Sequence, residues 1–207
     1  GYACAAIAFA DEFVYSNRRR YISNTVQILE NLIHRVKLER MNSELAEMHI
    51  RDPLTGLLNR RGFYKKFETL CSEGRSIYLF SVDMDRLKYI NDTFGHNEGD
   101  RAIKAVAASL TSVAGCELVC SRFGGDEFEV IGCSDDFSPE DYISEVRAYL
   151  EDYNRSSGAP YRVEVSVGME KTDLSGWSSS DSIDDIIRIA DARMYEDKRS
   201  RKAVREQ

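Results

Sequence analysis

A pair of glycines between two β-rich runs, followed at once by two acidic residues, is the strongest constraint on the fold of this 207-residue chain. The pair is Gly124-Gly125, and the acids are Asp126 and Glu127. The flanking runs predict two strands, and Gly-Gly predicts a two-residue hairpin turn with positive φ angles. The two carboxylates then serve either to bind a cation or to solubilise an ordinary surface hairpin. This window alone leaves both interpretations open.

A second acidic cluster, Asp83-Met84-Asp85, ends another predicted strand over residues 77–82. Residues two apart in an extended chain point to the same side, so Asp83 and Asp85 can share a face beside Asp126 on a neighbouring strand. Carboxylates that close repel one another unless a cation lies among them. Oxygen ligands of this kind suit Mg²⁺, which commonly completes its coordination with substrate phosphates. The sequence therefore predicts a magnesium site for a nucleoside triphosphate.

Alternating aspartates also begin the calcium loop of an EF-hand, but the sequence excludes that alternative. The calcium loop needs glycine at its sixth position and glutamate at its twelfth. Counted from Asp83, these positions hold Lys88 and Phe94. Lys88 is instead placed to interact with the negative charge of a phosphate. The alternative is that Lys88 is an ordinary solvated lysine on a short helix.

The stretch 89–100 is polar and glycine-punctuated, and it predicts a loop that leads into a helix over 101–112. Asp100 has two open roles. It is either an acid that interacts with the dipole at the helix N-terminus, or a partner of Asn91 in reading guanine. A carboxylate can accept from the ring N–H and the exocyclic amine of guanine, and adenine offers no such donor pair. With adenine, a buried Asp100 would be left unpaired, and a site built on such hydrogen bonds can reject an analogue that lacks them by roughly 10⁴-fold or more.

Together these residues resemble the GGDEF-domain diguanylate cyclases, whose signature pentapeptide stands verbatim at residues 124–128. The resemblance runs in order from residue 51 to about residue 202. It includes segments similar to the motif that opens the family's domain, its strand end with the substrate loop, its guanine loop and its closing helix. These segments are residues 51–61, 83–92, 95–100 and 190–198.

The resemblance implies that the chain condenses two GTP molecules into cyclic di-GMP, with Mg²⁺ or Mn²⁺ as its metal. It implies that Asp83, the main-chain oxygen of Met84 and Asp126 hold the metal ion. Asp126 would also be the base for the attacking 3′-hydroxyl of GTP, Lys88 would assist by stabilising phosphate charge, and Glu127 would support the metal site. The implied substrate-binding residues are Lys88, Asn91, His96, Asp100, Lys198 and Lys202.

Two departures from the family pattern bear on regulation and on phosphate binding. Many members carry an Arg-x-x-Asp product-inhibition motif shortly before the hairpin, where residues 115–118 of this chain read Gly-Cys-Glu-Leu. Product feedback through that motif is therefore not expected. In the closing helix, Arg201-Lys202 stands where the family usually has Gly-Arg. Lys202 supplies a point charge but not the planar fork of arginine.

The fold implied by the resemblance is a palm-like α/β (α+β) domain, in which helices surround a mostly antiparallel central sheet. It is related to the nucleotidyl cyclase and polymerase palm folds. Strands interleaved with helices in the sequence independently predict a layered α/β or α+β fold. The predicted helices lie near residues 61–71, 101–112, 139–153 and 183–199, with strands at 77–82 and 161–169 and a hairpin over 117–132.

Ahead of the catalytic region, an apolar heptad stripe predicts a coiled-coil signalling helix over residues 21–50. The stripe slips in phase near Lys37. The alternative is one amphipathic helix packed on its own domain. A dimer agrees with the implied mechanism, because each protomer would hold one GTP, and tethering raises the effective concentration of the second site to roughly millimolar. The stripe residues are Ile22, Val26, Leu29, Ile33, Val36, Leu38, Met41, Leu45 and Met48.

Residues 1–20 are expected to be the truncated end of an upstream sensor domain, and residues 51–203 the catalytic domain. The apolar run 2–10 is too short to cross a bilayer and lacks the basic start of a signal peptide. We interpret it as a last sensor strand, with the tail of a membrane span as the alternative. Attachment to a membrane is therefore expected only through missing upstream regions.

Charge and cysteine content exclude some classes of partner. Residues 1–50 hold six acids and six bases, so the net charge of −7 falls on the remainder, and an acidic domain is a poor binder of nucleic acid. The five cysteines show no zinc spacing and indicate reduced thiols in the cytoplasm. Two rival functions stay open: a catalytically silent domain that binds GTP or a partner, and a cyclase with another nucleotide product.

Overall fold

The computed structural model describes residues 26–27, 29–38, 50–115, 118–133, 138–178 and 182–205. The chain divides into two compact units, Gly1–Met48 and His49–Gln207. In the first unit, residues 29–38 are helical, and the stripe residues Leu29, Ile33 and Val36 are each more than half exposed, at 53%, 56% and 63%. None of the described helices is long and apolar enough to cross a membrane.

Part of what the sequence predicted for the first unit lies outside the described residues. This applies to the strand expected within residues 1–20 and to four of the stripe residues. Those four are Ile22, Met41, Leu45 and Met48.

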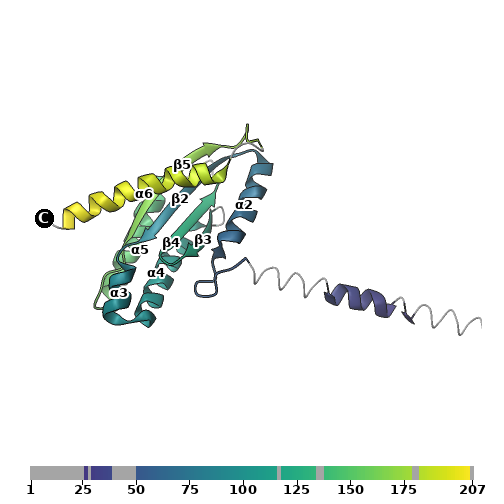
Figure 1. Cartoon of the computed structure of the whole chain (residues 1–207), viewed down its shortest axis with the longest axis horizontal. Helices are drawn as coiled ribbons and strands as arrows, with labels where there is room; N and C mark the ends of the chain where they lie inside the picture. Colours follow the sequence, from purple (N-terminus) through teal and green to yellow (C-terminus); the bar gives the residue numbers. More distant parts are fainter. Residues whose placement is uncertain are drawn as a thin grey trace, which may run out of the picture. The chain divides into compact units, whose positions relative to one another are not determined.

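The second unit is built on a five-stranded sheet with the order β1-β3-β4-β2-β5 (Figure 1). β1 pairs with β3 in parallel, and the other neighbouring strands are antiparallel, so the predicted mostly antiparallel sheet is confirmed. The strands are β1 (Leu58–Asn59), β2 (Ser76–Met84), β3 (Leu118–Gly124), β4 (Glu127–Gly132) and β5 (Val165–Asp173).

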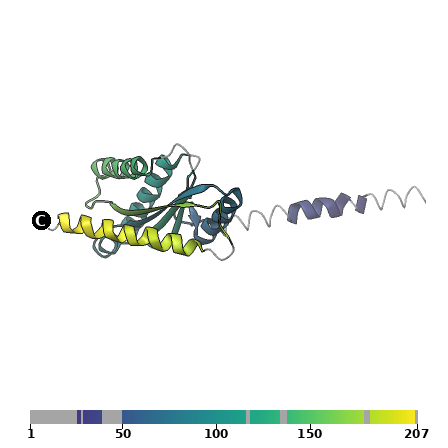
Figure 2. The ribbon, with the colours of Figure 1, turned by 90° about the horizontal axis from the view of Figure 1, so that it is seen from above.

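Helices cover both faces of this sheet. α4 and α5 pack on one face, and α6 lies along the other, which it shares with α2 (Figure 2). Local caps explain some of the boundaries: the Asn59 side chain accepts from Gly62 N before α2, and Ser138 does the same for Asp141 N before α5. The helices are α2 (Arg60–Glu73), α3 (Leu87–Phe94), α4 (His96–Ala114), α5 (Pro139–Ser156) and α6 (Ile183–Arg205).

The central strand β2 carries two different rows of side chains, because successive residues of a strand face opposite sides. Towards α4 and α5 the row is apolar throughout and buried. Towards α2 and α6 the row begins apolar and ends polar. The first row is Tyr78, Phe80, Val82 and Met84, and the second is Ile77, Leu79, Ser81 and Asp83.

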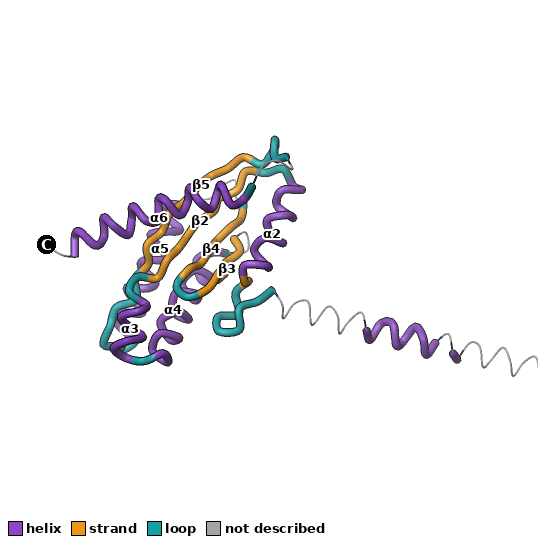
Figure 3. The backbone as a smooth tube through the Cα atoms, viewed as in Figure 1, coloured by secondary structure: helices purple, strands orange, loops and turns teal. Residues whose placement is uncertain are grey.

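The hairpin turn lies one residue further along than the sequence predicted. Its two central residues are Gly125 and Asp126, whereas the prediction placed the turn on the glycine pair (Figure 3). The cause is a shift of register between Arg122 and Gly124, which leaves Phe123 without an opposite residue on β4. Both glycines still have positive φ, 152° and 51°, as expected. The shift places Asp126 within the turn itself.

The predicted polar loop over residues 89–100 is wrong, because α3 and the first turn of α4 occupy it. Leu87 and Ile90 are buried and Phe94 is partly buried, so the apolar spacing of α3 packs it against the core. α4 begins at His96, so Asp100 lies in its second turn and not at its N-terminus.

The last strand also differs from the prediction, since β5 begins at Val165 and not at Tyr161. Tyr161 and Val163 are buried as their alternation suggested, but they precede the ladder. The side chain of Asn154 on α5 takes the place of a strand partner. It accepts from Val163 N at 2.7 Å and donates to Val163 O at 2.9 Å.

Candidate functional site

The end of β2 and the tip of the β3–β4 hairpin meet at one end of the sheet. β2 and β4 are antiparallel neighbours, and Asp83 is the register partner of Glu127. The main-chain N–H of Met84 donates to the carbonyl oxygen of Asp126 at 2.9 Å. Asp83, Met84, Asp126 and Glu127, which the sequence singled out as metal ligands, therefore lie together.

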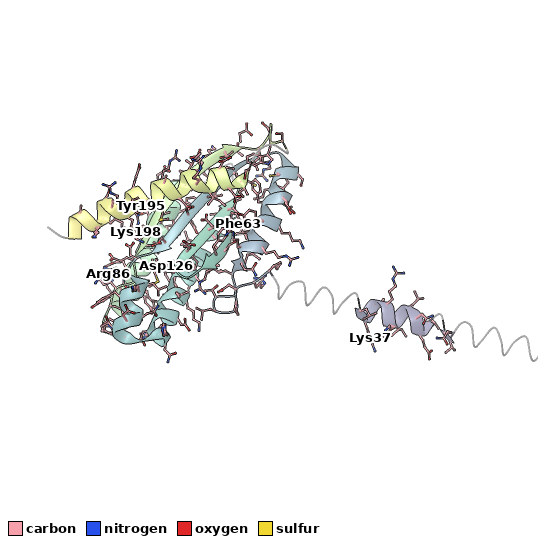
Figure 4. All side chains as sticks on the ribbon, viewed as in Figure 1. Lys37, Phe63, Arg86, Asp126, Tyr195 and Lys198 are labelled. Carbon is pink, nitrogen blue, oxygen red and sulfur yellow. The ribbon has the colours of Figure 1, made fainter. Side chains whose placement is uncertain are left out.

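A lysine from the far end of the chain reaches this acidic end. Lys198 on α6 donates through Nζ to Asp83 Oδ1 at 2.6 Å, and the Asp83 side chain is only 14% exposed. Figure 4 labels Lys198 and Asp126, and the two residues lie near each other in that view. Asp83, Asp85 and Asp126 all act electrostatically on Lys198, so its ammonium balances several carboxylates at once.

The pKa values of this ion pair reflect its partial burial. Burial raises the pKa of Asp83, the nearby charges of Asp126 and Asp85 raise it further, and the hydrogen bond from Lys198 opposes them. For Lys198, burial lowers the pKa, but the hydrogen bond and the attraction to Asp83 outweigh burial and leave the pKa raised. Both shifts follow from partial burial and from the close contact between the two side chains.

Helix α6 is held closely on β5, which fixes where Lys198 starts. A Cβ atom built on Gly168 would lie 2.0 Å from Ala190 O and 2.2 Å from Met194 N, so only glycine admits this approach. One turn further, Asp197 accepts from Arg147 on α5 at 2.7 Å and from Val167 N on β5 at 3.0 Å. These contacts were not foreseen from the sequence.

Asp85 does not join the carboxylates in the way that the sequence predicted. It is 3% exposed, accepts from Ser166 Oγ at 2.8 Å, and lies 3.9 Å from Arg201 Nε. It follows the last residue of β2, where the strict alternation of an extended chain no longer applies. Arg201, which departs from the family pattern, therefore has a structural contact of its own.

The hairpin tip is braced by the segment that opens the domain. Arg122 donates from Nη2 to Gly125 O at 2.8 Å and from Nη1 to both oxygens of Asp52, at 3.1 and 3.2 Å. Asp52 also accepts from the main chain and the hydroxyl of Thr55. Burial alone would raise the pKa of Asp52, but the bonds from Thr55 and Arg122 outweigh it and lower the pKa. Sequence reasoning assigned no role to Asp52 or Arg122, although Asp52 lies within the motif that opens the domain and Arg122 lies just before the signature pentapeptide.

The predicted guanine-reading residues lie on α3 and α4, which pack against each other. The amide oxygen of Asn91 occupies the space beside Gly99, where a Cβ atom would come within 1.9 Å of it, and Asp100 is the next residue. His96 begins α4 and Lys88 lies in the first turn of α3, both exposed to solvent. Lys202 is exposed one turn beyond Lys198 on α6.

A cleft of about 570 Å³ opens beside Glu127, between α2 and α6. Its lining includes Ser81 and Glu129, which are paired across β2 and β4. Glu129 is only 4% exposed, and the Ser81 hydroxyl lies 3.1 Å from each of its carboxyl oxygens. Burial raises the pKa of Glu129 well above its usual range. This buried acid was also missed from the sequence.

The residues at the acidic end fit a hard divalent cation. Among the residues that the structure describes, no group of three or more His, Cys, Asp or Glu side chains forms a ready metal centre. Two carboxylates and a main-chain oxygen are a donor set that leaves room for water and phosphate oxygens, as Mg²⁺ prefers. The ammonium of Lys198 on Asp83 shows that a positive charge is accepted at this place.

Comparison with known proteins identifies the family of this chain. The family described as "Diguanylate cyclase, GGDEF domain" matches residues 49–203. Diguanylate cyclase VdcA of Vibrio cholerae serotype O1 is 30% identical over 188 residues, covering 86% of this chain and 54% of VdcA. Cyclic di-GMP phosphodiesterase PdeB of Shewanella oneidensis is 33% identical over 117 residues, covering 56% of this chain and 13% of PdeB. The chain thus spans about half of VdcA and a small part of PdeB.

A solved structure supports the fold. The coiled coil and GGDEF domain of DgcB from Caulobacter crescentus, in complex with c-di-GMP, superposes with a TM-score of 0.70 at 24% identity. The match covers 86% of this chain and 95% of that one, and it supports the predicted palm-like architecture. The family match over residues 49–203 includes the whole sheet and the acidic end with the signature hairpin. This chain belongs to the GGDEF family of diguanylate cyclase domains.

Proposed function

We propose that the chain is the catalytic part of a diguanylate cyclase, which joins two GTP molecules into cyclic di-GMP and releases two pyrophosphates. The observation that carries this proposal is the meeting of Asp83 and Asp126 with Lys198 at one end of the sheet. Such an arrangement offers negative charge to a metal ion and positive charge to a triphosphate. It would work in the cytoplasm, where GTP is available.

In the proposed mechanism, Asp83, Asp126 and the main-chain oxygen of Met84 would hold Mg²⁺ or Mn²⁺, and Glu127 would support them. The metal, when bound, supplies polarisation of the phosphoryl oxygens, which contributes several kcal/mol in such sites. Asp126 takes the proton from the 3′-hydroxyl of one GTP. That oxygen forms a bond to the α-phosphorus of the second GTP, and the bond to pyrophosphate breaks.

The remaining residues position the nucleotide. Lys88, Lys198 and Lys202 stabilise the charge of the phosphates, and His96 contacts the nucleoside. Asn91 and Asp100 read the edge of guanine, since they come from helices that pack together. Asp100 is exposed at the surface of α4 and not buried as expected from the sequence, so its carboxylate is accessible to the ring N–H and the amine of guanine.

The reaction requires two protomers, because each holds one GTP and the product has two new phosphodiester bonds. We propose that residues 21–50 form a helix that pairs two copies of the chain. The exposed apolar side chains of Leu29, Ile33 and Val36 lie on one heptad stripe and support this pairing.

The second candidate is a catalytically silent domain that binds GTP or a partner and regulates. One relative, PdeB, is named for hydrolysis of cyclic di-GMP, so likeness to part of a protein does not by itself establish synthesis. The complete set of Asp83, Lys88, Asn91, Asp100 and Asp126 favours an active enzyme.

Product analysis tests the proposal. The purified chain is incubated with Mg²⁺ and either GTP or ATP, and the products are identified by chromatography and mass spectrometry. We expect cyclic di-GMP and pyrophosphate in a ratio of one to two from GTP, no product from ATP, and a rate per protomer that rises with protein concentration. Binding of GTP without turnover at any concentration would favour the silent domain, and a product from ATP would contradict the role of Asp100.

A further inference from the structure

Before any ligand binds, the cation at the acidic end is an ammonium group of the chain itself. Lys198 Nζ lies 2.6 Å from Asp83 Oδ1, within the electrostatic reach of Asp85 and Asp126. We propose that Lys198 is the resident counter-ion of this site and moves from Asp83 to phosphate oxygens when metal and triphosphate bind, so that the two ligands bind as a coupled pair. This inference rests on the proposed function for the identity of the ligands.

The resident cation is needed because the carboxylates are partly withdrawn from water. The Asp83 side chain is 14% exposed, and carboxylates that close repel each other strongly in a medium of reduced dielectric. Removing Lys198 would leave the mostly buried carboxylate of Asp83 without a compensating charge, which is costly. Lys198 therefore stabilises the ligand-free arrangement in which Asp83 and Asp126 already lie together.

The transfer needs only a side-chain movement, since the backbone of α6 is fixed. Asp197, the residue before Lys198, is bonded to both Arg147 and Val167 N, and Gly168 lets the helix lie directly on β5. The Lys198 side chain is itself 39% exposed and has four rotatable methylene groups. Its Nζ can leave Asp83 for a neighbouring phosphate while the helix keeps its place.

The arrangement couples the two ligands. Asp83 must give up Lys198 to bind a divalent ion, and Lys198 must give up Asp83 to bind a phosphate. Each ligand alone therefore breaks the ion pair and gives a new partner to only one of its two members. With both present, Asp83 and Lys198 each gain a new partner, and such reciprocal coupling typically amounts to about 5-fold to 150-fold in affinity.

The first measurement uses Mn²⁺ alone, whose free concentration is followed by electron paramagnetic resonance. Replacing Lys198 by Met should raise the affinity for Mn²⁺ about tenfold, because Asp83 no longer has to release an ammonium. The matched control is R199M, which removes a charge from the next residue, whose side chain is exposed. The control should stay within about twofold of the parent chain. Equal effects of K198M and R199M would overturn the proposal.

The second measurement is a double-mutant cycle with inorganic triphosphate in the absence of metal, followed by calorimetry. D83N should raise the affinity about tenfold, because it releases Lys198 for phosphate. In the K198M background, the gain in triphosphate affinity from D83N should be at least three times smaller. An equal gain in both backgrounds would show that Asp83 only repels phosphate and would overturn the exchange.

Both measurements can be read independently of catalysis. Thermal unfolding checks that each variant is folded, and K198Q replaces K198M if the latter is not. Neither measurement involves a nucleobase or turnover. If the chain makes no cyclic di-GMP but the coupling between Asp83 and Lys198 is found, only the proposed function is overturned. If the chain is active but the effects of D83N and K198M are additive, only the proposed movement of Lys198 is overturned.

Discussion

The two rows of side chains on β2 follow the same backbone but perform different tasks. The row towards α4 and α5 is apolar to its last residue, Met84, which is fully buried. The row towards α2 and α6 is apolar at Ile77 and Leu79 and then changes to Ser81 and Asp83. The strand thus holds the core together with one face and builds the candidate site with half of the other.

This difference suggests how an acidic site is tolerated inside a sheet. The apolar face of β2 is continuous with its neighbours on β4, Phe128 and Val130, which are also fully buried. The core is therefore built mainly from the apolar face, and the polar end can carry charges that a cation balances. Substitutions on the two faces should accordingly affect different properties.

The largest effect is expected for D126N, at the tip of the hairpin. Loss of a carboxylate that both binds metal and takes the proton should lower the rate of cyclic di-GMP synthesis roughly 10³-fold or more. The midpoint of thermal unfolding should stay close to that of the parent chain, because Asp126 lies in a turn and outside the core. Synthesis near the parent rate would show that another residue is the base.

Substitutions on the apolar face of β2 should lower the free energy of unfolding. Phe80 is fully buried and its ring centre lies 5.0 Å from that of Tyr142 on α5. F80A should lower the free energy of unfolding by about 3–5 kcal/mol, measured by urea denaturation. The control Y149A, at a residue of α5 that is 39% exposed, should change it by less than about 1 kcal/mol. A similar loss in both variants would contradict the assignment of this face as the core.

The strand and the acids at its end were predictable from the sequence, but the contacts at the polar end were not. The apolar run over residues 77–82 predicted the strand, and the acids at its end predicted the convergence of Asp83 and Asp126. The bond from Lys198 to Asp83 joins residues 115 positions apart, and no local pattern indicates such a partner. The position of the hairpin turn also escaped prediction, since it depends on the register shift beside Phe123.

The contact between Asp52 and Arg122, 70 positions apart, was missed for the same reason as that of Lys198, and it yields the smallest predicted effect. D52N removes the charge that holds Arg122 against Gly125, and should lower the free energy of unfolding by roughly 1–3 kcal/mol at pH 7. The control D152N, in an exposed ion pair with Arg155, should cost about 0.5 kcal/mol or less.

The pH dependence of the D52N effect has a definite sign. The pKa of Asp52 is lower in the folded chain than its ordinary value of 3.8, so the folded state favours the ionised form. Its contribution to stability is therefore complete above that ordinary value and is lost as the pH falls through the folded pKa. Urea denaturation from pH 7 down to pH 3 should show the parent chain and D52N converging at the acid end. A difference that stays constant over this range would mean that Asp52 braces the hairpin through its shape and its hydrogen bonds to Thr55, and not through its charge on Arg122.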